Sequence, residues 1–447
     1  VASTDYLNIS QSNGNRKTYT WSCWFKRSTL ATFQLLWHCN NAGHYSYFGF
    51  DGDDKLIYYA MDGATNQGDF KSTRVFRDVS SWYHIVARID TTESSSGDRL
   101  RFYINGEQIT SWDTSSQPMS QNTDTEMNVS GHTFRISTYN NGSSWLGGYL
   151  AECVFCDGQS LDPTSFGEFD EDSPSIWRPI DVSDLTFGTN GFHLDFENAS
   201  SLGADVSGNG NNFTVYNLTS VDQSIDTCTN NFATLNPLNN FWSAVTFSQG
   251  NCETTSNNTS AYYGVSTSTI GVSSGRWYFE AKNSTDSSGQ GILGITSRNQ
   301  TGRSTWLGST TQAYGYYATG GVIRSNSADT SYGQEFQQND IIGIYLDLED
   351  NKLYISDNGT LMNSGTGHSI TPASSTDSGF YHFAVGDNSD NTQVWQVNFG
   401  GSPAFTVSSG NTDDNGYGNF EYSPNITGDG VAKKFYALCT KNLAEFG

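Results

Sequence analysis

Two stretches of the sequence combine aromatic, amide and guanidinium side chains in a pattern typical of sugar binding. Aromatic rings stack on the apolar face of a sugar, and amide or backbone groups bond its hydroxyls. The candidate ligand-binding residues are Tyr139, Asn140, Asn141 and Trp145 in the stretch TYNNGSSW, and Arg303 and Trp306 in the stretch SRNQTGRSTWLG. The alternative for each aromatic residue is ordinary packing in a hydrophobic core.

Two other stretches place oxygen-bearing side chains at alternate positions before a glycine, as the first half of a calcium-binding loop does. The candidate calcium ligands are Asp205, Ser207 and Asn209 in the first stretch, and Asp413 and Asn415 in the second. Neither stretch is an EF-hand, because Tyr216 and Tyr422 stand where the bidentate Glu is required. The alternative is an Asx turn that holds the loop without a metal. Calcium is the one cofactor that the sequence suggests.

Motifs of catalytic sites occur in this sequence, but their context does not suit catalysis. Residues 289–294 spell G-x-G-x-x-G and residues 271–275 spell G-x-S-x-G, yet a strand is expected after each motif where a helix is required. The carboxylates of residues 167–174 are consecutive and precede a proline, which favours a polar turn over a glycosidase pair. The seven histidines form no H-E-x-x-H pattern. We therefore expect a protein that is not an enzyme.

Composition excludes several classes of partner. The formal net charge is −24, which opposes binding to nucleic acid, and no apolar run is long enough for membrane insertion.

Seven cysteines are too few for a disulfide scaffold. Cys153 and Cys156 form C-x-x-C within an expected strand, where this spacing directs them to opposite faces and favours a structural role. The chain starts without Met or a signal peptide, so we expect a processed chain or part of a longer one.

The elements that position these residues are expected to be strands. Residues 98–104 alternate apolar and polar before Asn105-Gly106, and residues 350–357 do the same before Asn358-Gly359, which predicts one tight hairpin in each half. Similar alternation recurs in residues 18–27, 44–63 and 81–92, and no window shows a sustained helical period. One-faced strands bury their apolar sides by packing two sheets together. We predict an all-β fold of two antiparallel β-sandwiches in tandem with a loop-rich connector.

Several motifs, taken in their order along the chain, resemble those of known protein families. DYLNI, YTWSCWFKR, WYHIVARID with LRFYINGEQI, and LAECVFCDGQSL, in that order, resemble the laminin-G-like, concanavalin A-like sandwiches, over residues 1–180. SGRWYFEAKNS, GILGITSRN, DIIGIYLDLEDNKLYISDNGTLM and WQVNFG resemble a SPRY domain, over residues 241–405. Residues 181–240 are expected to be a connector that lends strands to either sandwich, and residues 406–447 a C-terminal extension.

The whole chain also resembles virion-associated proteins of marine tailed bacteriophages. The resemblance rests on DPTSFGEFD, SIWRP, GTNGFHLDFEN, SGNGNNFTVYNLT, FATLNPL, GNTDDNGYG and ALCTKNL, which stand in that order around the two domains. It implies an extracellular virion protein of the tail-fibre or receptor-binding kind, with a host surface glycan or protein and other virion proteins as partners, and self-association as a trimer. The alternatives are a structural decoration protein of the capsid or tail and a secreted cellular lectin.

Overall fold

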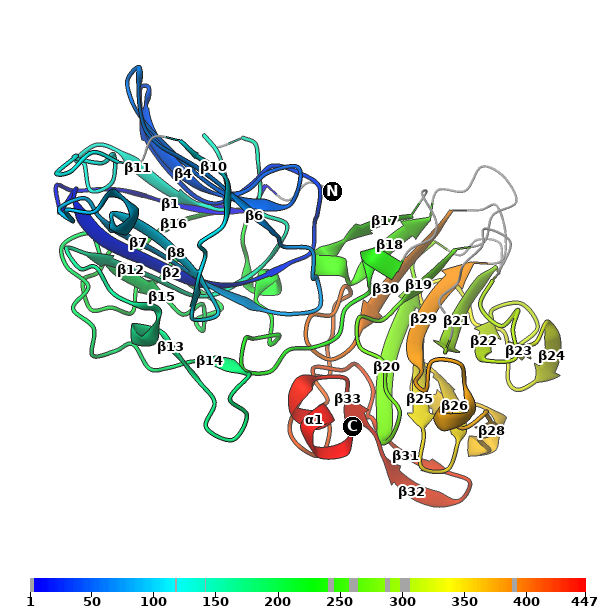
Figure 1. Cartoon of the computed structure of the whole chain (residues 1–447). Coiled ribbons are helices and arrows are strands. Elements are labelled where there is room, and N and C mark those ends of the chain that lie inside the picture. The colour runs from blue at the N-terminus through cyan, green and yellow to red at the C-terminus, as the bar shows by residue number, and fades with distance from the viewer. Residues whose placement is uncertain are drawn as a thin grey trace. The chain divides into compact units, whose positions relative to one another are not determined.

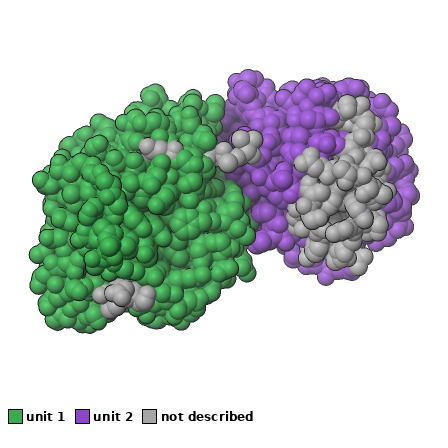
Figure 2. All heavy atoms as spheres, turned by 90° about the horizontal axis from the view of Figure 1, so that it is seen from above, with its two compact units in different colours: residues 1–229 green, residues 230–447 purple. Residues whose placement is uncertain are grey.

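The chain folds as two compact units of β-structure. The computed structural model describes residues 4–116, 119–140, 142–239, 245–256, 264–285, 290–297, 306–387 and 392–447. The first unit comprises residues 1–229 and the second residues 230–447 (Figures 1 and 2). Among the described residues the sole α-helix is α1 (Thr440–Phe446), and no helix there has the length and hydropathy needed to span a bilayer. The prediction of an all-β fold is confirmed.

The first unit is a sandwich of two antiparallel sheets. Sheet A has eight strands in the order β10 (Trp112–Ser116), β6 (Thr65–Val75), β5 (Lys55–Asp62), β4 (His44–Phe50), β3 (Gln34–Asn41), β11 (Thr133–Ile136), β1 (Tyr6–Ser10) and β16 (Thr214–Tyr216). Sheet B has six in the order β15 (Phe192–Leu194), β12 (Gly148–Asp157), β2 (Thr18–Arg27), β7 (Tyr83–Asp90), β8 (Leu100–Ile104) and β9 (Glu107–Gln108). Phe48 of sheet A packs against Trp21 and Phe102 of sheet B, so the core lies between the sheets.

The second unit repeats this architecture. Sheet C contains β17 (Val245–Ser248), β18 (Glu253–Ser256), β30 (Gln393–Asn398), β20 (Arg276–Asn283), β25 (Ile341–Asp347), β26 (Lys352–Asp357) and β27 (Thr360–Leu361), with β28 (His368–Ser369) and β33 (Tyr436–Ala437) paired to β26 and β20. Sheet D contains β19 (Val265–Thr267), β29 (His382–Asp387), β21 (Gly291–Thr296), β22 (Ala313–Tyr317), β23 (Val322–Ser325) and β24 (Ala328–Ser331). Phe279 of sheet C stacks on Phe383 of sheet D with 5.2 Å between ring centroids.

Smaller elements complete the two units. The pair β13 (Gly167–Phe169) and β14 (Trp177–Pro179) belongs to the first, and the pair β31 (Asn425–Gly428) and β32 (Val431–Lys434) to the second. Short 3-10 helices occupy Ser96–Asp98, Pro163–Ser165, Ser220–Asp222, Pro237–Asn239, Gln249–Asn251, Asn363–Gly365 and Ala373–Ser375.

The two Asn-Gly pairs form the tight turns that the sequence predicts. Asn105 and Gly106 connect β8 to β9 with φ values of 49° and 82°, and Asn358 and Gly359 connect β26 to β27 with 46° and 78°. Left-handed conformations at both central residues match the twist of the flanking strands, and Asn and Gly adopt them at low cost. Local chemistry therefore sets the register of one hairpin in each unit.

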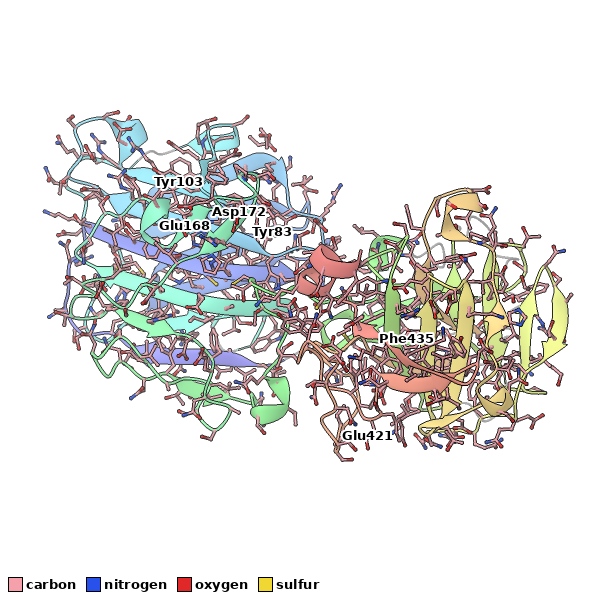
Figure 3. The ribbon with its side chains drawn as sticks, turned by 90° about the horizontal axis from the view of Figure 1, so that it is seen from below. Tyr83, Tyr103, Glu168, Asp172, Glu421 and Phe435 are labelled. Atoms are coloured by element: carbon pink, nitrogen blue, oxygen red, sulfur yellow. The ribbon has the colours of Figure 1, made fainter. Side chains whose placement is uncertain are left out.

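The outer face of sheet B is covered by chain from residues 159–187. Tyr103, Val154 and Cys156 point out from sheet B and pack against Phe166 and Phe187. Figure 3 views this side of the molecule, with Tyr103 of β8 and Glu168 of β13 labelled. Cys153 instead lies in the core between the sheets. The two cysteines of C-x-x-C therefore point to opposite faces and serve packing, as their spacing predicts.

Residues 181–229 are integrated into the first sandwich. Strand β15 pairs with β12 and β16 pairs with β1. Further along, Asp226 lies 2.7 Å from the ammonium of Lys26, both side chains are 1% exposed, and the same carboxylate accepts a hydrogen bond from Trp82 Nε1 at 3.0 Å. A buried ion pair with a third donor fixes this segment against sheet B, because neither charge is stable there without the other.

Residues 406–447 are held to the second sandwich through Glu280, which is fully buried on β20. Its carboxylate accepts hydrogen bonds from the Tyr278 hydroxyl (2.9 Å), Asn398 Nδ2 (3.0 Å), and the backbone N–H groups of Glu421 (3.0 Å) and Tyr422 (2.7 Å). Burial raises the pKa of Glu280 to about 7, although the four donors act in the opposite direction. Glu421 is labelled in Figure 3.

We expect Asp226→Ala to destabilise the first unit strongly. The change leaves the Lys26 ammonium buried without its counter-ion, which costs about 3–5 kcal/mol in the free energy of unfolding. Urea denaturation of the full chain, followed by tryptophan fluorescence, measures this loss. The matched control Asp184→Ala removes an exposed carboxylate and is expected to change the free energy by less than about 0.5 kcal/mol. Equal effects of the two substitutions would contradict the anchoring role of Asp226.

Glu280 is expected to make the stability of the second unit depend on pH. Its folded-state pKa of about 7 lies above its ordinary value of 4.5, so the folded state binds the proton more tightly between these values. The resulting stabilisation is complete below about pH 4.5 and is lost as the pH rises to about 7, with a magnitude on the order of 3 kcal/mol. Urea midpoints of the wild type and Glu280→Gln across this range test it. The variant should lack this pH-dependent component, and parallel pH profiles would refute the prediction.

Candidate binding face

The outer face of sheet A carries an aromatic and polar row that crosses six of its strands. On the inner side of β4, Ser46, Phe48 and Phe50 point into the core, so Tyr45 and Tyr47 point outward. The strand register aligns the outward positions of neighbouring strands as direct partners. From β1 to β6 the row is Asn8, Arg135, His38, Tyr47, Tyr59 and Asp69.

Four tyrosines form the centre of this surface, and we call them the tyrosine face: Tyr45, Tyr47, Tyr59 and Tyr139. Tyr47 stacks on Tyr59 with ring centroids 5.5 Å apart, and Tyr45 lies 6.2 Å from Tyr47 with the rings almost parallel, at 7°. All four side chains are half-buried, and their hydroxyls make no hydrogen bond to any other residue that the structure describes. Burial raises the pKa of Tyr47 above its usual range, so the hydroxyl stays protonated as a donor.

The loop between β11 and β12 places Tyr139 over the middle of the row. The Tyr139 N–H donates to the Ser143 carbonyl at 2.9 Å, and the Tyr139 ring lies 4.5 Å from His38 and 6.3 Å from Tyr47. The neighbouring Asn140 is exposed and accepts a 2.6 Å hydrogen bond from Asn40 Nδ2. Of the residues predicted from the sequence, Tyr139 therefore belongs to the tyrosine face and Asn140 borders it.

His38 and Arg135 form the buried floor beside the tyrosines. His38 is fully buried, and neither ring nitrogen has a hydrogen-bond partner within the described chain. Burial and the nearby Arg135 lower the pKa of His38 to about 3, so its ring is neutral. The Arg135 guanidinium donates to the side-chain oxygen of Asn40. This floor combines one cation with a neutral ring that has an unused acceptor and an unused donor.

Trp145 lies in a second aromatic cluster at the other edge of sheet A. Its ring is 5.8 Å from Tyr6, which stacks on Tyr216 at 4.3 Å with the rings 5° from parallel. The structure therefore separates Trp145 from Tyr139, although the sequence groups both in one loop. Burial raises the pKa of Tyr6, and the charge of Arg135, which lies between the two clusters in the strand order, acts in the opposite direction.

The remaining sugar-binding candidates are only partly placed. Asn141 and Arg303 lie outside the residues that the structure describes. Trp306 is half-buried and precedes Leu307, which packs in a small apolar cluster of the second unit. For the part of this loop that is described, the geometry indicates packing and gives no aromatic surface comparable to the tyrosine face.

The first calcium candidate is an Asx-type loop held by its own backbone. Asp205 Oδ1 accepts hydrogen bonds from the backbone N–H groups of His193 and Ser207, both at 2.9 Å, and Oδ2 accepts one from Asn211 at 2.8 Å. The Asn209 amide donates to the carbonyl oxygens of Gly188 and Gly191. Asp205 already has donors on both oxygens, so the geometry favours the alternative of a loop without metal.

The second calcium candidate also has its carboxylate occupied. Asp413 is buried, and Oδ1 accepts from the N–H groups of Asn415 and Tyr417, at 3.0 and 2.9 Å. Its Oδ2 accepts from the Ala437 N–H at 3.0 Å and from Asn442 Nδ2 at 2.7 Å. Four donors around one carboxylate tie the C-terminal segment together and leave no oxygen directed toward a cation.

One further group of possible metal ligands occurs among the described residues. Atoms of His44, at the start of β4, Asp62, at the end of β5, and Glu126, between β10 and β11, lie within 4.8 Å of one another. His44 Nδ1 is 2.8 Å from Asp62 Oδ1, and the Arg16 guanidinium is 3.4 Å from Glu126 Oε1. Arg16 supplies the positive charge that a metal would bring, so the group is consistent with an ion-pair cluster.

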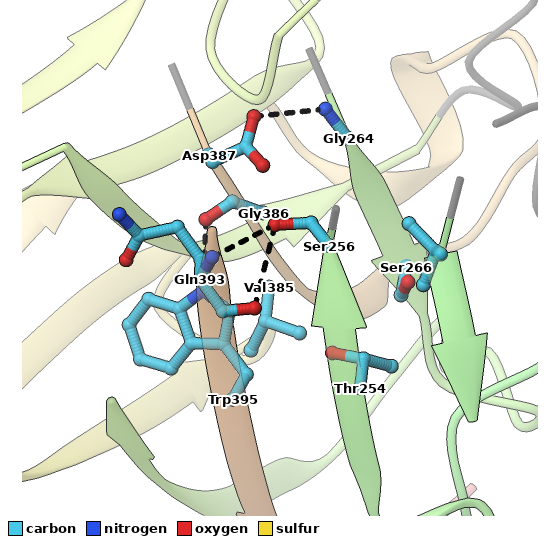
Figure 4. Close-up of a pocket in the computed structure, with 10 residues that line it drawn as sticks. Thr254, Ser256, Gly264, Ser266, Val385, Gly386, Asp387, Gln393 and Trp395 are labelled. Atoms are coloured by element: carbon cyan, nitrogen blue, oxygen red, sulfur yellow. Dashed lines mark hydrogen bonds between the residues drawn. The ribbon is translucent and has the colours of Figure 1, made fainter. Parts of the chain in front are cut away.

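A small pocket lies where sheets C and D approach in the second unit (Figure 4). Asp387 accepts a hydrogen bond from the Gly264 N–H at 3.1 Å, Gln393 N–H donates to Ser256 Oγ at 3.0 Å, and Trp395 Nε1 donates to the Gly386 carbonyl at 2.8 Å. These bonds connect neighbouring strands. In the described part of this pocket, the polar groups named here serve to join strands.

Comparison with known proteins agrees with the two sandwiches. Residues 1–158 match the model of the concanavalin A-like lectin/glucanases superfamily, and residues 276–402 match the model of the SPRY domain. This chain carries a concanavalin A-like domain followed by a SPRY domain. The resemblances expected from the sequence are confirmed for both domains, whose families suggest a binding function.

Several solved structures are similar to parts of this chain. The SPRY domain of human HERC1 is 18% identical over 36% of this chain and 96% of that chain, with a TM-score of 0.30. A human SPRY domain is 14% identical over 34% and 94%, with a TM-score of 0.27. The native heptameric SAP-like pentraxin from Limulus polyphemus is 15% identical over 35% and 71%, with a TM-score of 0.26. No curated protein matches the chain.

Of the residues of the tyrosine face and its border, the sequence analysis names only Tyr139 and Asn140. Tyr45, Tyr47 and Tyr59 belong to strands whose inner positions are also aromatic, so alternation alone does not distinguish a binding role from core packing. A signal was nevertheless present in HYSYFGF, where Tyr stands at both positions that alternate with the core residues. Aromatic residues on both faces of a strand indicate either a second packing layer or a binding surface.

We expect calcium and chelator to leave the thermal stability of the chain unchanged. The carboxylates of Asp205 and Asp413 are saturated by N–H donors, so a cation would have to displace hydrogen bonds that hold the fold. Thermal unfolding with excess calcium and then with chelator measures this. At a calcium concentration about 100 times the Kd of a site, binding would add roughly 2.7 kcal/mol to the free energy of unfolding. A rise of several degrees in Tm with calcium would show that one of these loops, or the His44 cluster, binds it.

Proposed function

We propose that this chain is a non-enzymatic binding protein whose concanavalin A-like domain holds a saccharide on the tyrosine face. The observation that carries the proposal is the set of four half-buried tyrosines with hydroxyls unbonded within the described protein, on the open side of a sheet. Half-buried rings provide a rigid apolar platform, and their hydroxyls together with exposed Asn140 supply hydrogen bonds at its margin.

The charge of the protein supports a neutral saccharide over a polyanion. The net charge of −24 repels anionic polymers at long range, and Asp69 and Asp62 lie at the margin of the face. Arg135 is the cation of the row, and Asn40 accepts one of its hydrogen bonds. Stacking with neutral hydroxyl hydrogen bonds is therefore the main chemistry that we assign to the face.

We further propose that the protein is an extracellular component of a tailed-phage virion and acts in attachment to the host. The motif order that resembles marine-phage virion proteins across the whole chain supports this role. Its partners would be a host surface glycan or protein, other virion proteins and further copies of the chain, assembled as a trimer. Calcium has no assigned role in this proposal, because both candidate loops are closed by protein donors.

A structural role in the virion is the second candidate. The same aromatic surface that suits a sugar also suits a flat protein partner, since aromatic residues are enriched at protein interfaces. In that case the tyrosine face would pack against another virion protein and decorate the capsid or tail. A secreted lectin without a virus uses the same face in the same way, and only the source of the chain distinguishes it.

We expect the purified full chain to bind selected neutral polysaccharides on an array of bacterial surface glycans, both with calcium and with chelator. The double variant Tyr47→Ala/Tyr59→Ala should bind the same glycans at least about tenfold more weakly, a loss of about 1.4 kcal/mol, because it removes two stacking rings. Titration calorimetry against the strongest glycan measures the affinity.

A matched control keeps this test specific. Phe380→Ala removes a ring that is 39% exposed in the second unit and should leave glycan affinity unchanged. Circular dichroism and Tm confirm that each variant is folded. Unchanged binding by the double variant would refute the tyrosine face as the site. If the chain binds no glycan on a broad array, that result would favour the structural role, which pull-down with virion proteins then tests.

A further inference from the structure

Two cysteines face each other in the core of the first unit. Cys23 of β2 and Cys153 of β12 are both fully buried, and their Sγ atoms lie 3.1 Å apart. In a disulfide the two sulfurs are about 2.05 Å apart, with Cβ atoms about 3.8 Å apart. Adjacent strands of one sheet hold these two side chains together, with the sulfurs about 1 Å farther apart than in a disulfide.

A β-bulge in β12 creates this arrangement. Trp24 is the partner of Ala151 and Ser22 is the partner of Val154, so Glu152 and Cys153 together oppose Cys23. Glu152 has φ of 50°, a left-handed conformation that marks the extra residue. Because two residues of β12 oppose one residue of β2, the inward and outward positions of β12 shift by one residue at this point. This shift directs the Cys153 side chain to the inner face, where Cys23 also lies.

The other buried thiol of this core has a different environment. Cys39 donates to the side-chain oxygen of Gln11 at 3.1 Å and to the Glu126 carbonyl at 3.3 Å. Its position on β3 places it in sheet A, whereas Cys23 and Cys153 share sheet B. The Cys23 thiol also has carbonyl acceptors, on Trp24 at 3.1 Å and on Ala151 at 3.8 Å, and in addition it faces the Cys153 sulfur at 3.1 Å.

We propose that Cys23 and Cys153 are the site of an intrachain disulfide, formed when the chain folds in the presence of a small-molecule disulfide oxidant. One cysteine thiolate attacks the oxidant, releases one small thiol and forms a mixed disulfide. The second cysteine then attacks the protein sulfur and releases the other small thiol. Two protein thiols are oxidised and one small disulfide is reduced to two thiols.

The position of the pair dictates when this bond forms and what it does. Burial, followed by the neighbouring Cys153, raises the pKa of the Cys23 thiol well above its usual value, so the folded protein holds few thiolates for exchange. The mixed disulfide therefore forms while a cysteine is still accessible to the oxidant, and the pairing of β12 with β2 then brings the second thiol to it. It joins residues 130 positions apart, which restricts the unfolded chain and raises the stability of the first unit.

Oxidative refolding of the full chain tests the proposal. The denatured chain is refolded once with reduced and oxidised glutathione and once with excess reductant, then denatured and alkylated with N-ethylmaleimide. After oxidative refolding we expect two of the seven thiols to be protected and peptide mapping to recover a Cys23–Cys153 linked peptide. We also expect a higher Tm than in the reduced sample, with the difference abolished by reductant. Seven alkylated thiols after oxidative refolding would overturn the proposal.

Single variants identify the pair. Cys153→Ala should leave all of its thiols reactive and remove the Tm difference between oxidised and reduced samples. The matched control Cys39→Ala deletes a thiol from the same core and should keep the linked peptide and the Tm difference. If either variant fails to fold, peptide mapping of the oxidised wild type still decides, because a link between any other two cysteines contradicts the proposal.

Discussion

The interlocking of aromatic side chains between sheets A and B is the constraint on which the first unit depends. Phe48 packs against Trp21 and Phe102, and this contact requires the even-numbered residues of β4 to face inward. Since side chains alternate strictly along a strand, Tyr45 and Tyr47 must then face outward. The candidate binding surface is thus a geometric consequence of the core: a slip of one residue would bury the tyrosines and expose the phenylalanines.

The two outer faces of this sandwich differ in whether another segment of the chain covers them. Residues 159–187 cover the outside of sheet B, where Trp177 Nε1 donates to His84 at 2.9 Å and Phe166 packs on Tyr103. Burial lowers the pKa of His84 to about 3, as it does for His38 on the opposite sheet. His84 has two hydrogen-bond partners, Trp177 and Ser22, whereas His38 has none among the described residues. A covered histidine with partners is structural, whereas His38 is buried beneath half-buried tyrosines and its ring has no hydrogen-bond partner among the described residues.

Buried carboxylates perform the same task at several points in the chain. Asp226, Glu280 and Asp413 each hold a segment distant in sequence by accepting hydrogen bonds from N–H or O–H donors, and Asp226 also pairs with a buried ammonium. Such groups destabilise a fold when a partner is lost and give it specificity when all partners are present. They explain how an acidic chain with long polar loops keeps its connecting segments ordered: some of its negative charges are inside, with donors around them.

Alternation and the two Asn-Gly turns were sufficient to predict strands, hairpins and two sandwiches, because these are local properties of period two and backbone conformation. The same local reading placed Tyr139 and Asn140 in a loop suited to sugars. It could not show that Tyr139 lies over His38 of β3 while Trp145 joins Tyr6 of β1, since these contacts depend on which strands become neighbours. Nor could it show that Asp205 and Asp413 accept hydrogen bonds from residues as distant as His193 and Ala437. The sequence by itself determined the elements and their apolar faces. Only the tertiary structure decided which polar faces stay open and which side chains share them, because strand order and register are set by the packing of the whole core.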